Sequence, residues 1–353
     1  MKGSLDLRDD PSPALLAEAL AGLPARPGAG HGILVLDATR AIVAACASAA
    51  GELVAIQPWK PHFDALAQAG VAARPRLEDG DRGFAVALLA LGRNRARNLA
   101  RLAQAVACVA PGGWIVAAGA NELGAARYAK LAGATRTIAR HHGRAFVLAR
   151  EDAPARAVLA EWLAAGSARR HDATGHVSAP GAFAWDRIDP GSRLLAAALP
   201  TDIAGEAADL GAGWGYLSAH LAATCPSLRG IDLHEADHDA LDAARANLAG
   251  AASRLAIGFH WSDVAGGLGG RRYDAIVSNL PFHDTHGADP GIGIAFIRAA
   301  ARALRPQGRF WLVANRHLPY ERALSAAFAR VAPVGEAEGY KILVASAPQN
   351  VPG

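Results

Sequence analysis

The 353-residue chain has only three cysteines, and they follow no recognisable pattern. Cys46, Cys108 and Cys225 have neither the paired spacing of a disulfide framework nor the clustered spacing of a zinc site. Each half of such a chain is long enough to bury a sizeable apolar core without cross-links. The cysteines therefore predict small buried side chains in a reducing, cytoplasmic compartment, and no metal is implied.

The chain also lacks a long uninterrupted apolar run. Its most apolar stretch, residues 33–56, is broken by Asp37, Arg40 and Glu52, which excludes a membrane-spanning helix there. The first ten residues have no apolar core after their charges, so we expect no secretory signal. Aromatic residues are few, and alanine and glycine account for the high mean hydropathy. These features predict a protein without a membrane partner.

Length and charge set wider limits. A chain of 353 residues is too long for one ordinary α/β domain and suits two. The formal net charge of +4 and the isoelectric point of about 9.2 permit an acidic partner such as RNA without demanding one.

The same order of elements occurs twice along the chain. Each pass has a short apolar strand, a second strand ending in polar residues, a third strand, a helix, and a glycine-marked turn into a fourth strand. Strands that alternate with helices predict a mostly parallel sheet covered on both faces. We expect two α/β domains, 1–165 and 166–353, the second beginning with a polar linker. The matched segments are 33–39, 53–58, 84–93 and 111–119 in the first pass, and 207–213, 228–234, 273–282 and 306–315 in the second.

A glycine-rich turn opens the second pass. Gly211 and Gly213 follow an apolar strand, and such glycines allow the backbone to approach a nucleotide-like ligand at a helix N-terminus. A dinucleotide fingerprint would need glycine at position 216, where Tyr216 stands. The spacing, with Asp209 two residues before the first glycine, favours S-adenosylmethionine over a nicotinamide cofactor. Asp232 is predicted to end the next strand and to accept the two ribose hydroxyls. Leu233 and Asn279 are also expected to contact the cofactor.

The third strand of this pass runs directly into Asn279-Leu280-Pro281-Phe282. The lone pair of an exocyclic base amine is delocalised, so the amine is a poor nucleophile. The side-chain oxygen of Asn279 and the Leu280 carbonyl can each accept one N–H and stabilise the positive charge that develops during methyl transfer. Pro281 stiffens the turn and Phe282 stacks on the base. The tetrad resembles the Asn/Asp-Pro-Pro-aromatic signature of amino-methyltransferases, and this resemblance predicts such an enzyme.

Several segments together resemble the ribosomal RNA small subunit methyltransferase C family. The resemblance implies two tandem Rossmann-like class I methyltransferase folds with mostly parallel seven-stranded sheets, the first of them degenerate. It also implies S-adenosylmethionine as cofactor. The implied target is a guanine N2 of 16S ribosomal RNA, either in the RNA itself or in a ribosomal subunit assembly intermediate. The first pass agrees, because it has Asp37-Ala38-Thr39 in place of the glycines. The segments are AADLGAGWGYLS, IDLHEAD, YDAIVSNLPFHD, LVANRHLPYERAL, the upstream 180–195 and Gly339-Tyr340-Lys341.

One departure leaves the target base open. The family usually has proline where Leu280 stands, and Asn-Leu-Pro-aromatic tetrads resemble those of adenine dimethyltransferases of ribosomal RNA. His283 after the tetrad favours the guanine family. The alternatives are a guanine of 23S ribosomal RNA, adenine N6, or a protein glutamine. A NAD(P)-dependent oxidoreductase and a non-catalytic RNA-binding module are more distant interpretations.

Other signals are weaker. Asp263 follows an apolar stretch at a position where such enzymes often hold the adenine amino group. Residues 234–238 match the HExxH zinc pattern, but His234 directly follows the strand of Asp232, so a zinc protease is not expected. Basic residues could hold RNA phosphates: Arg93, Arg95, Arg97 and Arg101 in the degenerate half, and Arg316 and Lys341 in the second.

Overall fold

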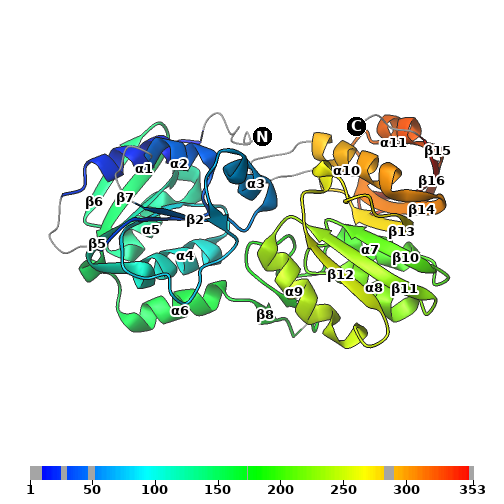
Figure 1. The fold of residues 1–353 in the computed structure, drawn as a ribbon, viewed down its shortest axis with the longest axis horizontal. Coiled ribbons are helices and arrows are strands. Elements are labelled where there is room, and N and C mark those ends of the chain that lie inside the picture. Colours follow the sequence, from blue (N-terminus) through cyan, green and yellow to red (C-terminus); the bar gives the residue numbers. More distant parts are fainter. Residues whose placement is uncertain (1–9, 25–29, 47–51, 173, 282–289, 350–353) are drawn as a thin grey trace. The chain divides into compact units, whose positions relative to one another are not determined.

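The computed structural model describes residues 10–24, 30–46, 52–172, 174–281 and 290–349. The chain divides into two compact units, Leu5–Ser167 and Ala168–Gly353. Each unit is a three-layer α/β fold with its own central sheet (Figure 1). The two units are described separately.

The sheet of the first unit has seven strands in the order β3-β2-β1-β4-β5-β7-β6. Strands β1 to β5 are parallel, and β7 is antiparallel to both β5 and β6. The strands are β1 Ile33–Leu36, β2 Leu53–Ile56, β3 Ala73–Arg74, β4 Phe84–Ala90, β5 Val109–Ala120, β6 Arg136–Arg140 and β7 Gly143–Ala149; the helices are α1 Ser12–Ala21, α2 Arg40–Cys46, α3 Lys60–Gln68, α4 Arg95–Cys108, α5 Ala125–Ala132 and α6 Arg156–Gly166, with 3-10 turns at Asn121–Leu123 and Arg150–Asp152.

The sheet of the second unit repeats this order as β12-β11-β10-β13-β14-β16-β15. A small hairpin, β8 Arg169–Arg170 with β9 Val177–Ser178, precedes it. The strands are β10 Gly205–Leu210, β11 Leu228–Glu235, β12 Ala256–Trp261, β13 Tyr273–Asn279, β14 Leu304–Asn315, β15 Phe328–Ala337 and β16 Tyr340–Pro348; the helices are α7 Pro190–Ala198, α8 Tyr216–Thr224, α9 His238–Leu248, α10 Pro290–Ala303 and α11 Glu321–Ala327, with 3-10 turns at Ala249–Ala251 and Val264–Gly266. The prediction of two tandem, mostly parallel seven-stranded folds is confirmed.

Both faces of each sheet are buried, because successive strand residues point to opposite sides. In β10, Ala208 and Leu210 pack with α10 and α11, whereas Ala207 packs on the other side with α7, α8 and α9. Two such clusters also flank the sheet of the first unit. This arrangement leaves the carboxyl ends of the parallel strands as the edge where polar side chains can gather, as open α/β folds require of a ligand site.

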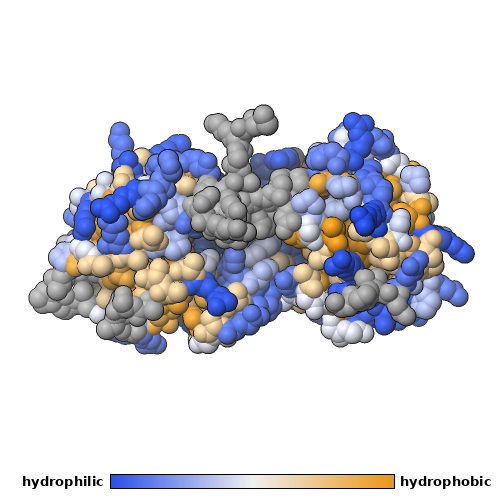
Figure 2. Space-filling view, turned by 90° about the horizontal axis from the view of Figure 1, so that it is seen from above, coloured by the Kyte–Doolittle hydropathy of each residue, from blue (hydrophilic) through white to orange (hydrophobic). Residues whose placement is uncertain are grey.

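No helix in the described part of the chain is long and apolar enough to cross a membrane. On the face seen in Figure 2, hydrophilic residues are interspersed with hydrophobic ones on both units.

Candidate active site

The glycine turn between β10 and α8 adopts a backbone that side chains resist. Gly211, Gly213 and Gly215 have φ of 69°, 55° and 86°, in the left-handed region. A Cβ on Gly215 would lie 3.1 Å from Ala244 of α9, so this glycine allows the turn to pack against that helix. A Cβ on Gly213 would meet nothing within 4 Å, so Gly213 borders open space at the carboxyl edge.

Asp209 fastens this turn to the start of α8. Its Oδ2 accepts hydrogen bonds from the Ser218 amide at 3.1 Å and the Ser218 hydroxyl at 2.7 Å. Burial raises the pKa of Asp209 to about 6, against the opposing effect of these hydrogen bonds. Its buried Oδ1 has no hydrogen-bond partner among the described residues. A buried carboxylate oxygen in this state can accept from a ligand's ammonium group.

The prediction that Asp232 ends the second strand is wrong. Strand β11 continues to Glu235, and Asp232 lies three residues inside it. Asp232 already accepts hydrogen bonds from the Tyr273 hydroxyl at 2.8 Å and the Arg271 guanidinium at 2.9 Å, and it lies 2.9 Å from the His260 ring nitrogen. Leu233 is fully buried in the apolar core, so its side chain cannot contact a cofactor.

Strand β11 extends past Asp232 because the backbone of His234 still pairs with Leu210 of β10 and His260 of β12. The His234 ring is also held inside the fold. Its two ring nitrogens lie 3.1 Å from the Ser262 and Tyr273 hydroxyls, and its ring stacks on that of His260. Ligand atoms of Asp232, His234 and His260 lie within 4.8 Å of one another, which is close enough for a metal ion. The positive charge of Arg271 beside Asp232 disfavours a cation there, and the cluster instead joins β11 to β12 and β13.

Glu235 is the carboxylate that the structure places at the end of β11. Its Oε2 accepts from the Gly213 amide at 2.7 Å, and its Oε1 accepts from the Asp237 amide at 2.7 Å. Burial raises the pKa of Glu235 to about 7, although the Asp237 and Gly213 amides oppose the rise. The sequence analysis missed this residue. The signal was available in Asp237, which caps α9 and so places the end of the strand just before it.

Asp263 lies at the same edge of the sheet. It follows β12 after one residue, Ser262, and the last residue of that strand, Trp261, pairs with Glu235. Its side chain accepts from the Ala265 amide at 2.9 Å and caps the 3-10 turn Val264–Gly266. Asp263 and Glu235 therefore stand at the ends of neighbouring strands, as a ligand spanning a ribose and a base requires.

Asn279, the last residue of β13, is held in one orientation by two side chains from another segment. Its amide nitrogen donates to Asp189 Oδ2 at 2.8 Å and to Ser192 Oγ at 2.9 Å. A carboxylate only accepts hydrogen bonds, so its partner on Asn279 must be the NH₂ group. The Asn279 Oδ1 atom consequently points elsewhere, and no hydrogen bond to it is found among the described residues.

The segment that holds Asn279 is the upstream stretch singled out in the sequence. Asp189 caps α7 by accepting from the Ser192 amide at 2.9 Å. Gly191 lies against Tyr340 of β16, where a Cβ would come within 2.8 Å of the ring. One carboxylate thus starts the helix and orients the asparagine.

Leu280 and Pro281 continue from Asn279. The Leu280 amide donates to the Val313 carbonyl at 3.0 Å, and its side chain is buried in the core around α10. Packing of the core behind the site therefore restricts which residue type fits at position 280. The other two predicted residues of this turn, Phe282 and His283, lie outside the described residues.

A strap of chain between β9 and α7 presents an exposed aromatic ring that the sequence analysis did not identify as functional. Phe183 is 63% exposed. The next residue, Ala184, has a φ of 47°, a costly conformation for a non-glycine residue, and its carbonyl accepts from the Trp214 indole of the glycine turn at 3.4 Å. The strap therefore runs from the glycine turn to Asp189 and holds Phe183 outward.

The corresponding site of the first unit is filled by an ion-pair cluster. Asp37 directly follows β1, just as Gly211 directly follows β10 in the second unit. The φ of Asp37 is 52°. Asp37 pairs with Arg97 at 3.1 Å and Arg101 at 3.0 Å. Burial alone would raise the pKa of Asp37, but Arg101 and then Arg97 outweigh burial and hold it well below its usual range. Leu91 takes the place of Leu280, donating to Ala118 of the next strand at 2.7 Å.

These contacts correct part of the predicted RNA-binding set. Arg97 and Arg101 hold Asp37, and Lys341 is buried, donating to the Leu318 carbonyl at 2.6 Å and pairing with Glu321. These three side chains are therefore engaged within the fold. Exposed positions remain for Arg93, Arg95 and Arg316, of which Arg316 pairs with Glu336 at 2.9 Å.

Comparison with known proteins agrees with this geometry. Residues 174–344 match the family model of the methyltransferase small domain. The ribosomal RNA small subunit methyltransferase C of Klebsiella pneumoniae is 39% identical over 149 residues, which are 42% of this chain and 42% of the relative. That of Salmonella typhi is 35% identical over 170 residues, 47% of this chain and 48% of the relative. The match thus spans less than half the length of these relatives.

A solved structure covers nearly the whole chain. The Thermus thermophilus 16S rRNA N2 G1207 methyltransferase (RsmC), in complex with AdoMet and guanosine, superposes with a TM-score of 0.77 and 27% identity over 98% of this chain and 93% of that one. The second unit is therefore similar to the methyltransferase small domain and has the class I fold. The fold of the whole chain is similar to that of this RsmC structure, and each unit has the same strand order.

Proposed function

We propose that this chain uses S-adenosylmethionine to methylate the exocyclic N2 amine of a guanine in 16S ribosomal RNA. The observation that carries the proposal is the fixed orientation of Asn279. With its NH₂ group bound to Asp189 and Ser192, its carbonyl oxygen is the group available to a base. An amine has two N–H donors for that oxygen and the neighbouring carbonyl, whereas a hydroxyl has only one donor and a carbonyl has none.

The residues at the carboxyl edge fit the cofactor. Gly213 borders open space, Glu235 and Asp263 end neighbouring strands, and Asp209 has an oxygen without a partner among the described residues. We assign Glu235 to the ribose hydroxyls, Asp263 to the adenine amine and Asp209 to the methionine ammonium. When bound, S-adenosylmethionine supplies an electrophilic methyl group.

The chain's own part in the reaction is positioning and charge stabilisation. Asn279 Oδ1 and the Leu280 carbonyl accept the two N–H groups of the amine and orient its lone pair. As the nitrogen becomes positive, these two oxygens stabilise it more strongly than they stabilise the neutral amine. One of the amine protons then leaves to water. Because the partners are aligned beforehand, most of the rate gain is positional.

The aromatic contact to the base is assigned to two rings. Phe282 follows Pro281 in the predicted tetrad, and Phe183 projects from the strap that also carries Asp189. A base reaches such rings only when it is unstacked, which favours a single-stranded or flipped nucleotide.

Guanine in the small-subunit RNA is favoured by the relatives' own names and by the guanosine bound to the T. thermophilus protein. Methylation of a guanine of 23S RNA, of adenine or of a protein glutamine would change the assigned substrate. A ribosomal RNA substrate also places the protein in the cytoplasm.

We assign the first unit a supporting role. Its ion-pair cluster occupies the place of the cofactor turn, so it holds no cofactor there. Its exposed Arg93 and Arg95 can contact phosphates.

The test combines purified protein and cells. Labelled S-adenosylmethionine should transfer its methyl group to small-subunit RNA, and digestion should release N2-methylguanosine. Asn279→Ala should abolish transfer while leaving cofactor affinity within about twofold, since its lost contacts are made to the base. If cells lacking the protein retained every methylated guanine of 16S RNA, the assignment would fail. Product on adenosine or glutamine would redirect it.

A further inference from the structure

The edge of the second unit opposite the active site carries a cluster of arginines. Parallel strands begin there, and six arginines stand at or beside their first residues or on α10. We call this set the arginine edge: Arg229, Arg272, Arg302, Arg305, Arg309 and Arg330. Arg229 lies 3.8 Å from Glu206 and Arg305 pairs with Asp274, whereas the other four form no ion pair in the described part of the chain, so positive charge is in excess.

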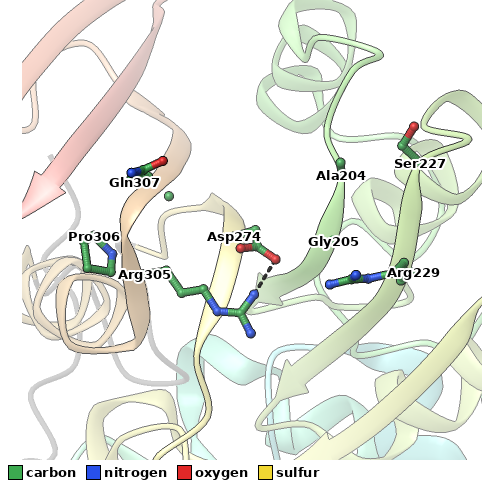
Figure 3. Close-up of a pocket in the computed structure, with 9 residues that line it drawn as sticks. Ala204, Gly205, Ser227, Arg229, Asp274, Arg305, Pro306 and Gln307 are labelled. Atoms are coloured by element: carbon green, nitrogen blue, oxygen red, sulfur yellow. Dashed lines mark hydrogen bonds and ion pairs between the residues drawn. The ribbon is translucent and has the colours of Figure 1, made fainter.

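Two shallow hollows open on this edge. Figure 3 shows the first, where Arg229 and Arg305 flank Asp274 and Arg305 pairs with it at 2.5 Å. The second hollow shares Arg305 and adds Arg272 and Arg302, with no carboxylate among its lining residues. Arg305 is already paired with Asp274, so the uncompensated positive charge of this hollow comes from Arg272 and Arg302. An anion bound there would reduce the repulsion between these two guanidinium groups.

Several of these arginines have no acidic partner among the described residues. Arg272 donates to the Arg302 carbonyl, which leaves its charge uncompensated. Arg309 and Arg330 lie on either side of Ser346 in adjacent strands and are exposed. Neither they nor Arg302 form an ion pair in the described part of the chain.

The catalytic edge shows the opposite pattern. Its ligand-facing carboxylates are Asp209, Glu235 and Asp263, and they give this edge little attraction for a phosphate backbone. Several arginines of the same unit outside the arginine edge are compensated: Arg187 pairs with Asp186 at 3.0 Å, Arg193 with Glu338 at 2.7 Å and Arg316 with Glu336 at 2.9 Å. Backbone affinity must therefore come from elsewhere.

We propose that the arginine edge binds phosphates of the substrate RNA remote from the methylated nucleotide. This inference rests on the proposed function and extends it to the class of substrate. Strands of six or seven residues separate the two edges by about 20 Å. A short oligonucleotide bound at Asn279 is too short to contact the arginine edge at the same time. A folded RNA or a ribosomal subunit can contact both edges. The protein therefore prefers a large folded RNA over a short strand.

The experiment compares Arg302→Gln with Arg309→Gln, made together, against a control pair with the same change in net charge. The control is Arg127→Gln with Arg156→Gln, two exposed arginines on α5 and α6 of the first unit. Binding of full-length 16S RNA is measured at several salt concentrations, beside a short oligonucleotide containing the target guanine. Cofactor affinity and the melting temperature are measured for every variant.

We expect the arginine-edge pair to bind 16S RNA roughly tenfold more weakly at low salt, with the slope of log affinity against log salt reduced by about one to two. Oligonucleotide and cofactor affinities should stay unchanged, and the control pair should match the unmodified protein. Equal loss in the control, or no loss on 16S RNA, would overturn the inference. If the pair lowers the melting temperature, Arg330→Gln alone replaces it, because that side chain is exposed.

The experiment distinguishes failure of the proposed methyl transfer from failure of RNA binding by the arginine edge. RNA affinity and its salt dependence do not require methyl transfer. If the protein binds 16S RNA through this edge but transfers no methyl group, the proposed reaction is contradicted and RNA binding by the arginine edge is still supported.

Discussion

Asp189 and Asn279 lie 90 residues apart in the chain and 2.8 Å apart in the fold. The carboxylate accepts from the Asn279 NH₂ group and, through the same oxygen, from the Ser192 amide at the start of α7. The helix start and the asparagine orientation therefore depend on one side chain, which makes Asp189 a positioning residue.

Asp189→Ser should separate these two roles. Serine is also a good helix cap but is too short to reach Asn279. We expect kcat to fall on the order of 10²-fold through misorientation, with KM for RNA and cofactor affinity nearly unchanged. The control is Asn94→Ser, the same kind of cap replacement on α4 of the first unit. A drop in melting temperature with unchanged kcat would show that Asp189 only caps.

Glu235→Gln and Asp232→Asn should have different consequences. Glu235→Gln removes a charged hydrogen-bond acceptor for the ribose. It should therefore weaken cofactor binding, measured by calorimetry, roughly ten- to a hundredfold. Asp232→Asn should leave cofactor affinity intact and lower stability by about 1–3 kcal/mol, because Asp232 joins Tyr273, His260 and Arg271. The reverse pattern would restore Asp232 as the ribose ligand.

Cofactor affinity should rise between pH 6 and 8. The pKa of Glu235 is raised by burial to about 7, so the carboxyl is mostly protonated at pH 6 and loses one acceptor. In the ligand-free protein this raised pKa gives stability that is present below the ordinary glutamate pKa and is lost as pH rises through 7. Titration calorimetry in buffers of different ionisation enthalpy should detect proton release on binding. A pH dependence that persisted in Glu235→Gln would assign it to another group.

Asp37→Ala should destabilise the first unit. It leaves the nearly buried Arg101 and the neighbouring Arg97 without their carboxylate, at a cost of roughly 2–4 kcal/mol. Differential scanning calorimetry should show the transition of this unit moving down while cofactor affinity is unchanged. The exposed pair of Arg140 and Glu18 provides the control, since Glu18→Ala should cost less than about 1 kcal/mol. Equal shifts in the two variants would contradict the role of the cluster.

Phe183→Ala should weaken binding of RNA that contains the target guanine. Stacking of one base on an aromatic ring contributes about 1–3 kcal/mol, which corresponds to a rise in KM of roughly five- to a hundredfold. Phe183→Tyr should retain most of the affinity. Leu163→Ala, at an exposed apolar residue of α6, serves as the control. No change in KM for Phe183→Ala would remove this ring from the site.

Local sequence determined the repeated order of strands, the glycine turn and the position of Asn279. Each depends on neighbouring residues: apolar runs make strands, glycines allow left-handed backbone, and a strand that runs into proline stops. Even the degeneracy of the first unit followed from the residues at 37–39.

Tertiary structure decided the partners of these residues. Nothing near His234 in the sequence shows that Ser262 and Tyr273 hold its ring inside the fold, or that β11 pairs with β12 as far as Glu235. Arg101 looked like a free cation because Asp37, 64 residues earlier, is its neighbour only after folding. Charge and burial depend on what folding brings within a few ångströms, so sequence located the site and the fold selected the side chains available to act in it.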